Sequence, residues 1–198
     1  MKQHSEGVAI IMKSFALSYE YVDVYTYCGL LHDVGKYSKG FQKYIRAKGE
    51  KEPHAKWGAY MAKMEKSINV ALPVFGHHAG LPNRDAMFET LHQCEKEENK
   101  WHDVLHSIKD DGIHIPHCDN TSFNRIKENT TKELFVRLLY SSLVDADSLD
   151  TERHFEKEQY NARPQLALDV DALLDALNHK LSSFTLNSPL NRLRTEVR

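Results

Sequence analysis

The chain of 198 residues lacks a long apolar run, an even set of cysteines and an excess of basic charge. No apolar segment reaches the roughly 20 residues of a membrane helix, and polar residues follow Met1 at once, so we expect neither a membrane span nor a secretory signal. The three scattered cysteines argue against disulfides and favour a reducing cytoplasm. A net charge of -2 excludes a strongly basic nucleic-acid scaffold, so any contact with DNA must depend on a local patch.

The apolar residues that are present recur mostly at helical spacing, and no segment alternates in the manner of a strand. Three amphipathic stripes stand out, at 8–15, at 135–146 and, after Pro164, at 173–181. The second stripe consists of Phe135, Leu138, Ser142 and Ala146, flanked by Leu139 and Leu143. Residues 95–132 are polar and contain a Gly and a Pro, so they should form an irregular excursion around a short helix. The pattern predicts an all-α fold in a single domain.

Twelve histidines are the compositional hint of metal chemistry. His32-Asp33 follows two leucines that end a helical run, and Gly35 then lets the backbone bend, so imidazole and carboxylate can reach one cation. This dipeptide is common by chance. It gains weight from a set of further donors along the chain: His4, His54, His77, His78 and Asp147.

Each of these donors also has an ordinary interpretation. His54 stands where a helix can begin after Pro53, and alone it reads as a surface or capping residue. Gly58, one turn later, would let a neighbouring backbone or a metal approach closely. His77 and His78 diverge by roughly 100° in a regular helix, so both reach one site only if the helix ends there, as 79–82 suggests. In isolation, one ligand and one supporting residue is the safer interpretation.

Asp147 continues the second stripe, and its carboxylate should point towards the core, where it needs a partner or a cation. Asp145, Asp150 and Glu152 should lie on other faces of this helix or beyond its end, in solvated or capping roles. His4 lies near the start of the chain, where fraying is the default.

The order H…HD…H…HH…D is the ligand order of the HD metal-dependent phosphohydrolases. Four segments, 31–42, 53–59, 76–82 and 142–152, resemble the HD nuclease domain of the CRISPR-associated helicase–nuclease of type I interference systems. The tail 188–194 resembles the segment that leads into the helicase domain. The resemblance implies a compact HD-domain helical bundle at 1–187, with 95–132 as a variable excursion, and a linker-like tail at 188–198. No Gly-x-x-x-x-Gly-Lys-Ser/Thr phosphate loop follows.

The resemblance also implies a role for each donor. His4, His32, Asp33 and Asp147 would hold one metal, and His54, His77 and His78 a second, with Asp33 bridging. Such a mixture suits manganese, cobalt, nickel or iron better than magnesium. Two ions at this spacing can activate water for an in-line displacement. Lys36 could neutralise a phosphate oxygen, which makes Asp33 and Lys36 the expected catalytic pair, although most lysines in such places are simply solvated.

A basic stripe follows the dipeptide, with Lys36, Lys39, Lys43 and Arg46 at helical spacing and Tyr37, Phe41 and Tyr44 between them. Cations and rings beside a metal centre are what single-stranded DNA needs. An ordinary helix with its aromatics in the core is the alternative, so only Lys39, Lys43 and Arg46 are expected to bind nucleic acid. The histidines at 102, 106, 114 and 117 are expected to be surface residues.

The expected function is therefore metal-dependent endo- or exonucleolytic hydrolysis of single-stranded DNA in CRISPR antiviral interference. The partners that the resemblance implies are single-stranded DNA, a helicase domain, fused or separate, and an RNA-guided surveillance complex, with no membrane. Two alternatives stay open: an HD-type nucleotide phosphohydrolase, and a metal-stabilised interaction domain without turnover.

Overall fold

The computed structural model describes residues 1–46, 50, 52–164, 169–184 and 188–196. The chain divides into two units, residues 1–161 and 162–198, and each is described by itself. Within the described residues the regular elements are all helical and no strand occurs, so the all-α prediction is confirmed. Among these same residues, no helix is both long and apolar enough to cross a membrane.

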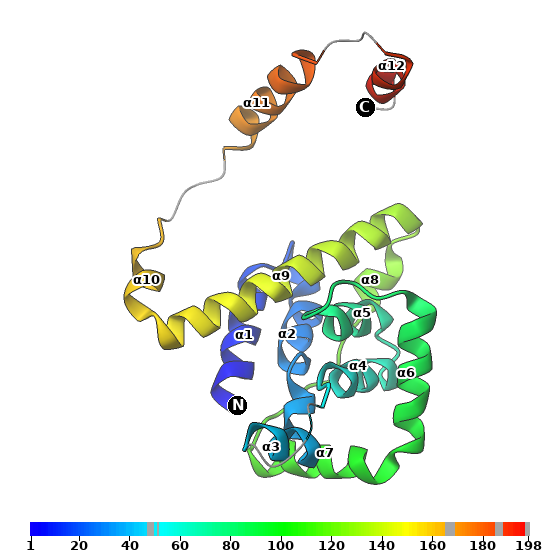
Figure 1. Cartoon of the computed structure of the whole chain (residues 1–198), viewed down its shortest axis with the longest axis vertical. Coiled ribbons are helices and arrows are strands. Elements are labelled where there is room, and N and C mark those ends of the chain that lie inside the picture. The colour runs from blue at the N-terminus through cyan, green and yellow to red at the C-terminus, as the bar shows by residue number, and fades with distance from the viewer. Residues whose placement is uncertain (47–49, 51, 165–168, 185–187, 197–198) are drawn as a thin grey trace. The chain divides into compact units, whose positions relative to one another are not determined.

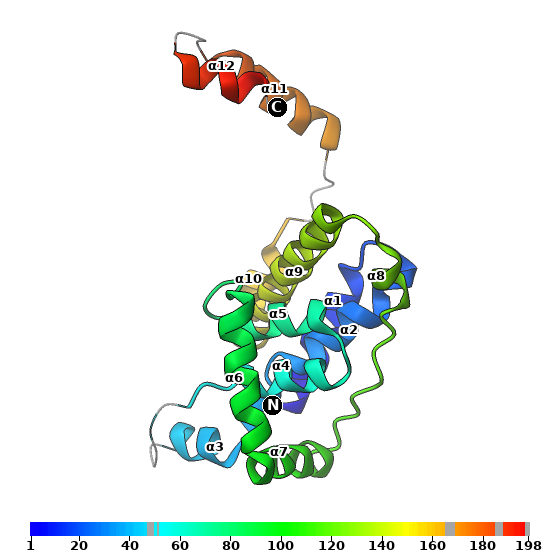
Figure 2. The ribbon, with the colours of Figure 1, turned by 90° about the vertical axis from the view of Figure 1, so that its right-hand side faces the viewer.

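The helices of the first unit are drawn in Figures 1 and 2. In chain order they are α1 (Lys2–Ser14), η1 (Tyr19–Tyr21), α2 (Val22–Leu31), η2 (Val34–Tyr37), α3 (Lys39–Ile45), α4 (Ala55–Met64), α5 (Ile68–Gly76), α6 (Arg84–Lys96), α7 (Glu98–Asp110), α8 (Thr121–Arg125) and α9 (Asn129–Phe155). A short helix, α10 (Lys157–Ala162), reaches the division between the units.

The first unit is built around α2, whose residues are apolar and buried on nearly every side. A helix of this kind needs neighbours all round, and α1, α4, α5 and α9 pack against it. The approach of α1 is close because Gly29 has no side chain, and a Cβ atom there would lie 2.8 Å from the Cα atom of Ala9. His32 and Asp33 follow α2 directly, and both are buried in the interior of the unit.

The long helix α9 contributes 27 residues and packs against α1, α2 and α5. Its buried stripe is Phe135, Leu139, Leu143, Ala146 and Asp150. The predicted stripe is therefore wrong at Leu138, which is 38% exposed. From Phe135 the buried face advances by steps of four, four, three and four residues, so it passes through Leu139 and not through Leu138. On α1 the predicted stripe is confirmed, because Val8, Ile11 and Met12 are buried.

The prediction of an irregular excursion at 95–132 is mostly wrong. Within it, α7 is a regular helix of 13 residues, and Val104 and Ile108 on it are buried. Trp101 stacks on Trp57 of α4, with ring centroids 6.0 Å apart, so α7 belongs to the core of the first unit. The irregular parts are residues 111–120, before the short helix α8, and residues 126–128, between α8 and α9. The three cysteines are free, in line with the expectation of no disulfide, and all three are buried.

The second unit contains α11 (Val170–Ser182) and α12 (Pro189–Glu196). The helix predicted after Pro164 is confirmed as α11, which Asp169 caps by accepting a hydrogen bond from the backbone N–H of Ala172. The expected boundary after residue 187 lies outside the described residues and stays a prediction.

Candidate metal centre

His32 and Asp33 occupy the short passage between α2 and η2, and both are buried. Nδ1 of His32 lies 2.7 Å from the carbonyl oxygen of Gly29, so it must donate its N–H to that acceptor. In the neutral ring Nε2 then carries no proton, and it faces Oδ2 of Asp33 at 3.2 Å. Gly35 does not have a positive φ, so the expected bend there does not depend on the left-handed conformation that glycine permits. A Cβ atom at Gly35 would overlap the carbonyl oxygen of His54, so glycine is needed for this close approach.

A first group of donors consists of His4, His32 and Asp33, with ligand atoms that all lie within 4.8 Å of one another. Nε2 of His4 lies 3.3 Å from Nε2 of His32 and 3.5 Å from Oδ2 of Asp33. Asp147 of α9 adds Oδ1 at 3.0 Å from Nε2 of His4 and at 3.8 Å from Nε2 of His32. The structure thus brings together the four donors predicted for the first metal.

A second group consists of Asp33, His54, His77 and His78, also within 4.8 Å of one another. Oδ1 of Asp33 lies 3.2 Å from Nε2 of His54 and 3.8 Å from Nε2 of His77. Nε2 of His78 faces Nε2 of His54 at 3.0 Å. The two oxygens of Asp33 therefore point to different groups, which is the arrangement expected of a bridging carboxylate.

His77 and His78 both reach the second group because α5 ends at Gly76, as predicted. His77 takes the position after the helix, and Gly80, with a φ of +93°, completes the turn. Nδ1 of His77 donates to the carbonyl oxygen of Val74 at 2.7 Å, which leaves Nε2 without a proton in the neutral ring. His54 takes the position before α4, also as predicted. A Cβ atom at Gly58 would overlap the carbonyl oxygen of Leu31, which confirms that glycine permits a close backbone approach there.

The charges around Asp33 explain how a carboxylate stays ionised in this interior. Burial alone would raise the pKa of Asp33, but His32, His54 and Lys36 hold it well below its usual range. Burial, with the neighbouring charge of His32, lowers the pKa of His77 to about 3. The hydrogen bond to Asp147 raises the pKa of His4 against the effect of burial. At neutral pH the centre therefore offers an anionic Asp33 and a neutral His77, which are the forms that bind metals.

Two buried atoms at the centre have no hydrogen-bond partner among the described residues: Oδ1 of Asp33 and Nε2 of His77. Both are acceptors in these protonation states, and an orphaned buried acceptor is costly. They also face each other at 3.8 Å. Imidazole nitrogens and carboxylate oxygens are donors that divalent metal ions accept. The donor set therefore fits divalent metal binding, as the sequence predicted.

Lys36 lies at the edge of the centre, and its Nζ atom is 2.5 Å from Oδ2 of Asp33. The helical stripe predicted from Lys36 to Arg46 is interrupted, because Ser38 is extended and caps α3 through its hydroxyl oxygen. Lys36 therefore belongs to η2 and to the centre. Lys39, Lys43 and Arg46 are exposed on α3 or just after it, and Lys39 pairs with Asp103 at 2.8 Å.

Of the three aromatic residues of the stripe, Tyr37 is buried in the core, whereas Phe41 and Tyr44 do not enter it as the ordinary interpretation expected. Tyr44 is exposed and Phe41 is half-buried, with its ring edge-on to that of His54 at 5.1 Å. Phe41 thus covers part of the second group. Four other histidines were expected at the surface and are confirmed there: His102, His106, His114 and His117.

The predictions for the end of α9 are partly wrong. Asp145 is exposed as expected, but Asp150 is buried and accepts a hydrogen bond from Nδ1 of His4 at 2.8 Å. Asp150 was expected on another face of this helix or beyond its end, but α9 continues to Phe155 and Asp150 lies on its buried face. Residues three apart share a helix face, so Asp150 stays beside Asp147.

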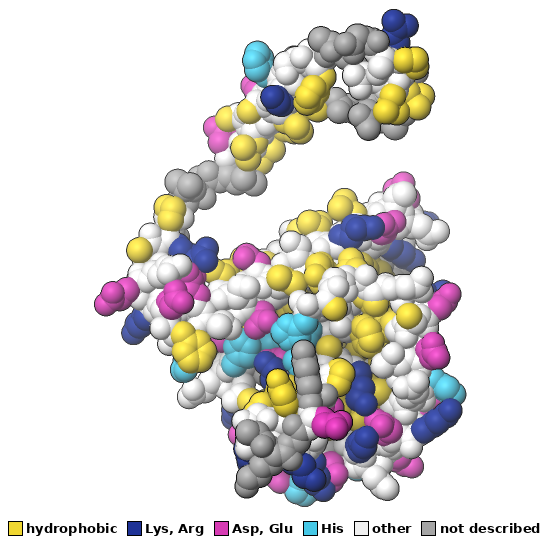
Figure 3. Space-filling view, viewed as in Figure 1, with side chains coloured by type: hydrophobic (Ala, Val, Ile, Leu, Met, Phe, Trp, Pro, Cys, Tyr) yellow, Lys and Arg dark blue, Asp and Glu magenta, His cyan; other side chains and the backbone are white. Residues whose placement is uncertain are grey.

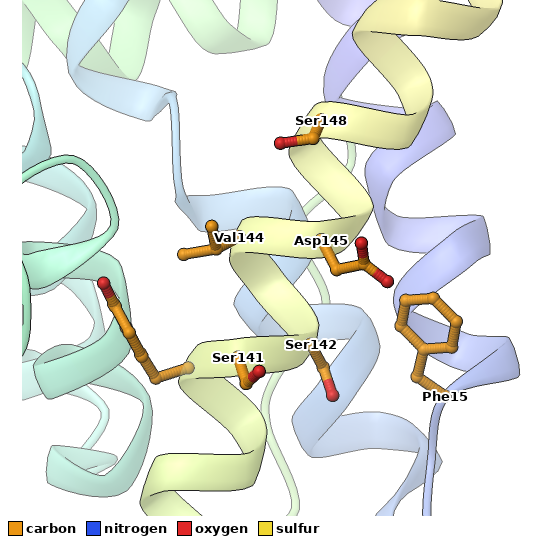
Figure 4. Close-up of a pocket in the computed structure, with 7 residues that line it drawn as sticks. Phe15, Ser141, Ser142, Val144, Asp145 and Ser148 are labelled. Carbon is orange, nitrogen blue, oxygen red and sulfur yellow. The ribbon is translucent and has the colours of Figure 1, made fainter.

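The centre opens to the surface of the first unit. In Figure 3 histidine side chains gather over its middle, beside acidic and basic ones. A pocket of about 520 Å³ adjoins the first group, and its lining includes His4, Asp33, Lys36, Arg153, His154 and Phe155. A second pocket, of about 570 Å³, lies elsewhere on α9, where Phe15 and Asp145 face it together with several serines (Figure 4). None of the predicted site residues lines that second pocket.

A profile of the HD domain matches residues 1–152. A search of curated proteins finds no match. The matched span contains every predicted metal donor, from His4 to Asp147, and ends within α9. Its His and Asp residues form the buried cluster described above. On this evidence the chain belongs to the HD-domain superfamily of metal-dependent phosphohydrolases.

Proposed function

We propose that the chain hydrolyses phosphate esters with two divalent ions, one in each donor group, and with Asp33 shared between them. The observation that carries this proposal is that hydrogen-bond acceptors lie close together in the donor groups. Nε2 of His32 and Nε2 of His77 each face an oxygen of Asp33, while the proton of each ring is committed to a backbone carbonyl. In the neutral ring a bare nitrogen this close to a carboxylate oxygen is repelled unless a proton or a metal ion lies between them, and a metal ion can occupy that place in both donor groups at once.

The seven donors would divide as the sequence predicted. His4, His32 and Asp147 would hold the first ion and His54, His77 and His78 the second. When bound, the ions would activate a water and offset the charge of the phosphate. The mixture of imidazole and carboxylate favours manganese, iron, cobalt or nickel over magnesium.

The chain's own residues would orient the ligand rings and neutralise charge on the phosphate. The backbone carbonyls of Gly29 and Val74 fix the rings of His32 and His77, so these ligands need little reorganisation on binding. Lys36 is a quarter exposed and its ammonium stands beside Asp33, where it can meet a phosphate oxygen. A cation already in place stabilises the charge that develops there in the transition state.

Among the possible substrates, a nucleotide requires the fewest assumptions beyond the family match, and the chain would then be a nucleotide phosphohydrolase. The pocket beside the first group supports it, because a space of about 520 Å³ suits a small ligand. Lys36 and Arg153 bring positive charge to this pocket, and Phe155 brings an exposed ring on which a base can stack.

The narrower proposal is a nuclease for single-stranded DNA that acts in CRISPR interference. Its support is the sequence: the four segments that resemble the type I HD nuclease supply all the donors except His4, and they supply Lys36 as well. A helicase domain and an RNA-guided surveillance complex as partners, and Lys39, Lys43 and Arg46 as the DNA contact, belong to this proposal.

One experiment separates these readings. The full chain, loaded with manganese, is given linear and circular single-stranded DNA, deoxynucleoside phosphates and bis-p-nitrophenyl phosphate. Cleavage of both DNA forms supports an endonuclease, and turnover of free nucleotides alone supports the nucleotide phosphohydrolase. Tight metal binding with no hydrolysis of any substrate would contradict both and leave a metal-stabilised interaction domain. The Asp33→Ala variant shows which hydrolysis belongs to the centre.

A further inference from the structure

Asp150 is a buried carboxylate that the proposed ligand set does not use. It lies one helical turn after Asp147 on α9 and is only 5% exposed. Its Oδ2 atom accepts a hydrogen bond from Nδ1 of His4 at 2.8 Å, and its Oδ1 atom accepts one from Arg153 at 2.5 Å. Both of its oxygens are thus engaged, one by a proposed metal ligand and one by a cation.

We propose that Asp150 is a positioning residue of the metal centre, which fixes the ring of His4 so that bare Nε2 faces the first donor group. The inference rests on the proposed metal centre and assigns Asp150 no contact with the ions. Asp150 accepts the Nδ1 proton at 2.8 Å and so opposes the other tautomer, in which Nε2–H would donate to Oδ1 of Asp147 at 3.0 Å. It thereby favours the tautomer in which Nε2 carries the free lone pair. A carboxylate in this place also makes the imidazole a stronger donor.

The other buried histidines show why His4 needs such a partner. His32 and His77 each donate Nδ1–H to the backbone carbonyl three residues earlier. For His4 that carbonyl belongs to Met1, and it already accepts the backbone N–H of Ser5 at 3.1 Å. The residue lies in the first turn of α1, where fraying is the default and Met1 provides no side-chain cap. Asp150 of α9 takes over the role that a backbone carbonyl plays for the other two rings.

Gly7 gives independent support from the opposite side of this contact. A Cβ atom at Gly7 would overlap Oδ1 of Asp150 and lie 2.7 Å from a terminal nitrogen of Arg153. The backbone of α1 therefore lies directly on the pair formed by Asp150 and Arg153. Any side chain at position 7 would push the carboxylate away from His4, one turn along the same helix.

The competing explanation is that Asp150 merely holds α1 against α9. The two roles differ in what is lost when the carboxylate is removed. A positioning residue acts through His4, so its removal should change the tautomer of that ring and the affinity of the first metal. A structural contact should change only the stability of the fold.

The test uses the full chain and the variants Asp150→Ala and Asp150→Asn, with Asp145→Ala as the matched control on the exposed face of α9. Calorimetry and metal analysis with manganese give affinity and stoichiometry. We expect Asp150→Ala to weaken one of the two ions by about 10–100-fold and to leave the other unchanged. Asp150→Asn, which keeps an acceptor oxygen, should restore part of the loss, and the control should match the parent chain.

A double-mutant cycle shows whether the effect passes through His4. In a His4→Ala background, removing Asp150 should have no further effect on metal affinity. Equal losses in both backgrounds would overturn the inference. So would a lower melting temperature of Asp150→Ala, after chelation, with unchanged metal affinity.

A metal-free readout keeps this test apart from the proposed function. Nitrogen NMR of the chelated chain at alkaline pH reports the tautomer of His4. We expect the Nδ1–H form in the parent and a mixture in Asp150→Ala, whether or not any phosphate ester is hydrolysed. The same mixture in both chains would overturn the role of Asp150, whereas a correct tautomer without hydrolysis would overturn only the proposed function.

Discussion

Nε2 of His54 lies 3.0 Å from Nε2 of His78, although one residue precedes α4 and the other follows α5. Two neutral imidazoles can meet in this way only if one ring donates its proton to the other. A metal ion bound by both rings would replace that proton. The packing of α4 on α5 therefore brings the rings of the second donor group together.

Metal should be required for hydrolysis, and transition metals should support it best. Five imidazoles among seven donors favour manganese, cobalt and nickel over magnesium. We expect chelation and dialysis to abolish turnover of bis-p-nitrophenyl phosphate, and manganese to restore more of it than magnesium. Full activity of the metal-free chain would contradict the two-metal proposal.

Asp33→Ala should remove activity with little change in helical content. The carboxylate faces both donor groups, so its loss should cost more than the roughly 10–100-fold that follows the loss of an outer partner. Initial rates and circular dichroism measure the two effects. His106→Ala and His117→Ala are the controls, because these exposed rings pair with Asp110 and Glu65, neither of which is a proposed metal donor. A comparable loss of rate in either control would show that the centre has been placed wrongly.

Reversing Lys39, Lys43 and Arg46 to Glu should weaken binding of single-stranded DNA. Each neutralised phosphate contributes roughly 0.7 to the log–log salt slope, so the loss of three contacts should lower the slope by about two units. Hydrolysis of the small diester should survive. Because Lys39 already pairs with Asp103, Lys43 and Arg46 should account for most of the change. An unchanged slope would mean that the strand, if there is one, follows another face.

Gly58→Ala should destabilise the fold. The added methyl would overlap the carbonyl oxygen of Leu31, directly before His32, and overpacking of this kind costs roughly 1–3 kcal/mol. Denaturant unfolding of the chelated chain measures it. Gly40→Ala is the matched control, since its methyl would meet only the carboxylate end of Glu52, a flexible side chain. Equal stability of the two variants would argue against a rigid contact between α4 and α2.

Acid should remove the first ion before the second. A proton competes with a metal for each ring. The pKa of His4 is raised by its hydrogen bond to Asp147, so this ring becomes protonated early as the pH falls. Burial lowers the pKa of His77 to about 3 and also lowers that of His78, so these rings stay available. Metal analysis across the mildly acidic range should show stepwise loss, and simultaneous loss would contradict this order.

The donor set was predicted from the resemblance to the HD phosphohydrolases, because each residue alone also has an ordinary interpretation. Two of the donor positions do leave a local trace in the sequence. Pro53 precedes the start of α4, and Ala79-Gly80 marks the end of α5. The order of the donors then selected the family. The role of Asp150 was not predicted, because it depends on where α9 ends, and helix ends are poorly encoded by periodicity. Its spacing of three from Asp147 was the available signal.

The fold was less predictable where polar residues conceal a buried face. Trp101, Val104 and Ile108 share one side of α7, but the charged residues between them hid this pattern. The basic stripe failed for the opposite reason. Its spacing was regular, yet Ser38 caps a new helix and separates Lys36 from the rest. The spacing of charged residues alone does not reveal that one helix ends and another begins where a serine hydroxyl accepts a backbone N–H.

The carboxylate of Asp33 has one oxygen directed to each donor group. Any two ions bound there are thermodynamically linked, because the charge that Asp33 shares with one ion alters what it offers the other. Linkage is reciprocal, so each ion must change the affinity of its neighbour by the same factor. The two ions then bind cooperatively, and the sign of the coupling between the two binding steps measures how Asp33 divides its charge between them.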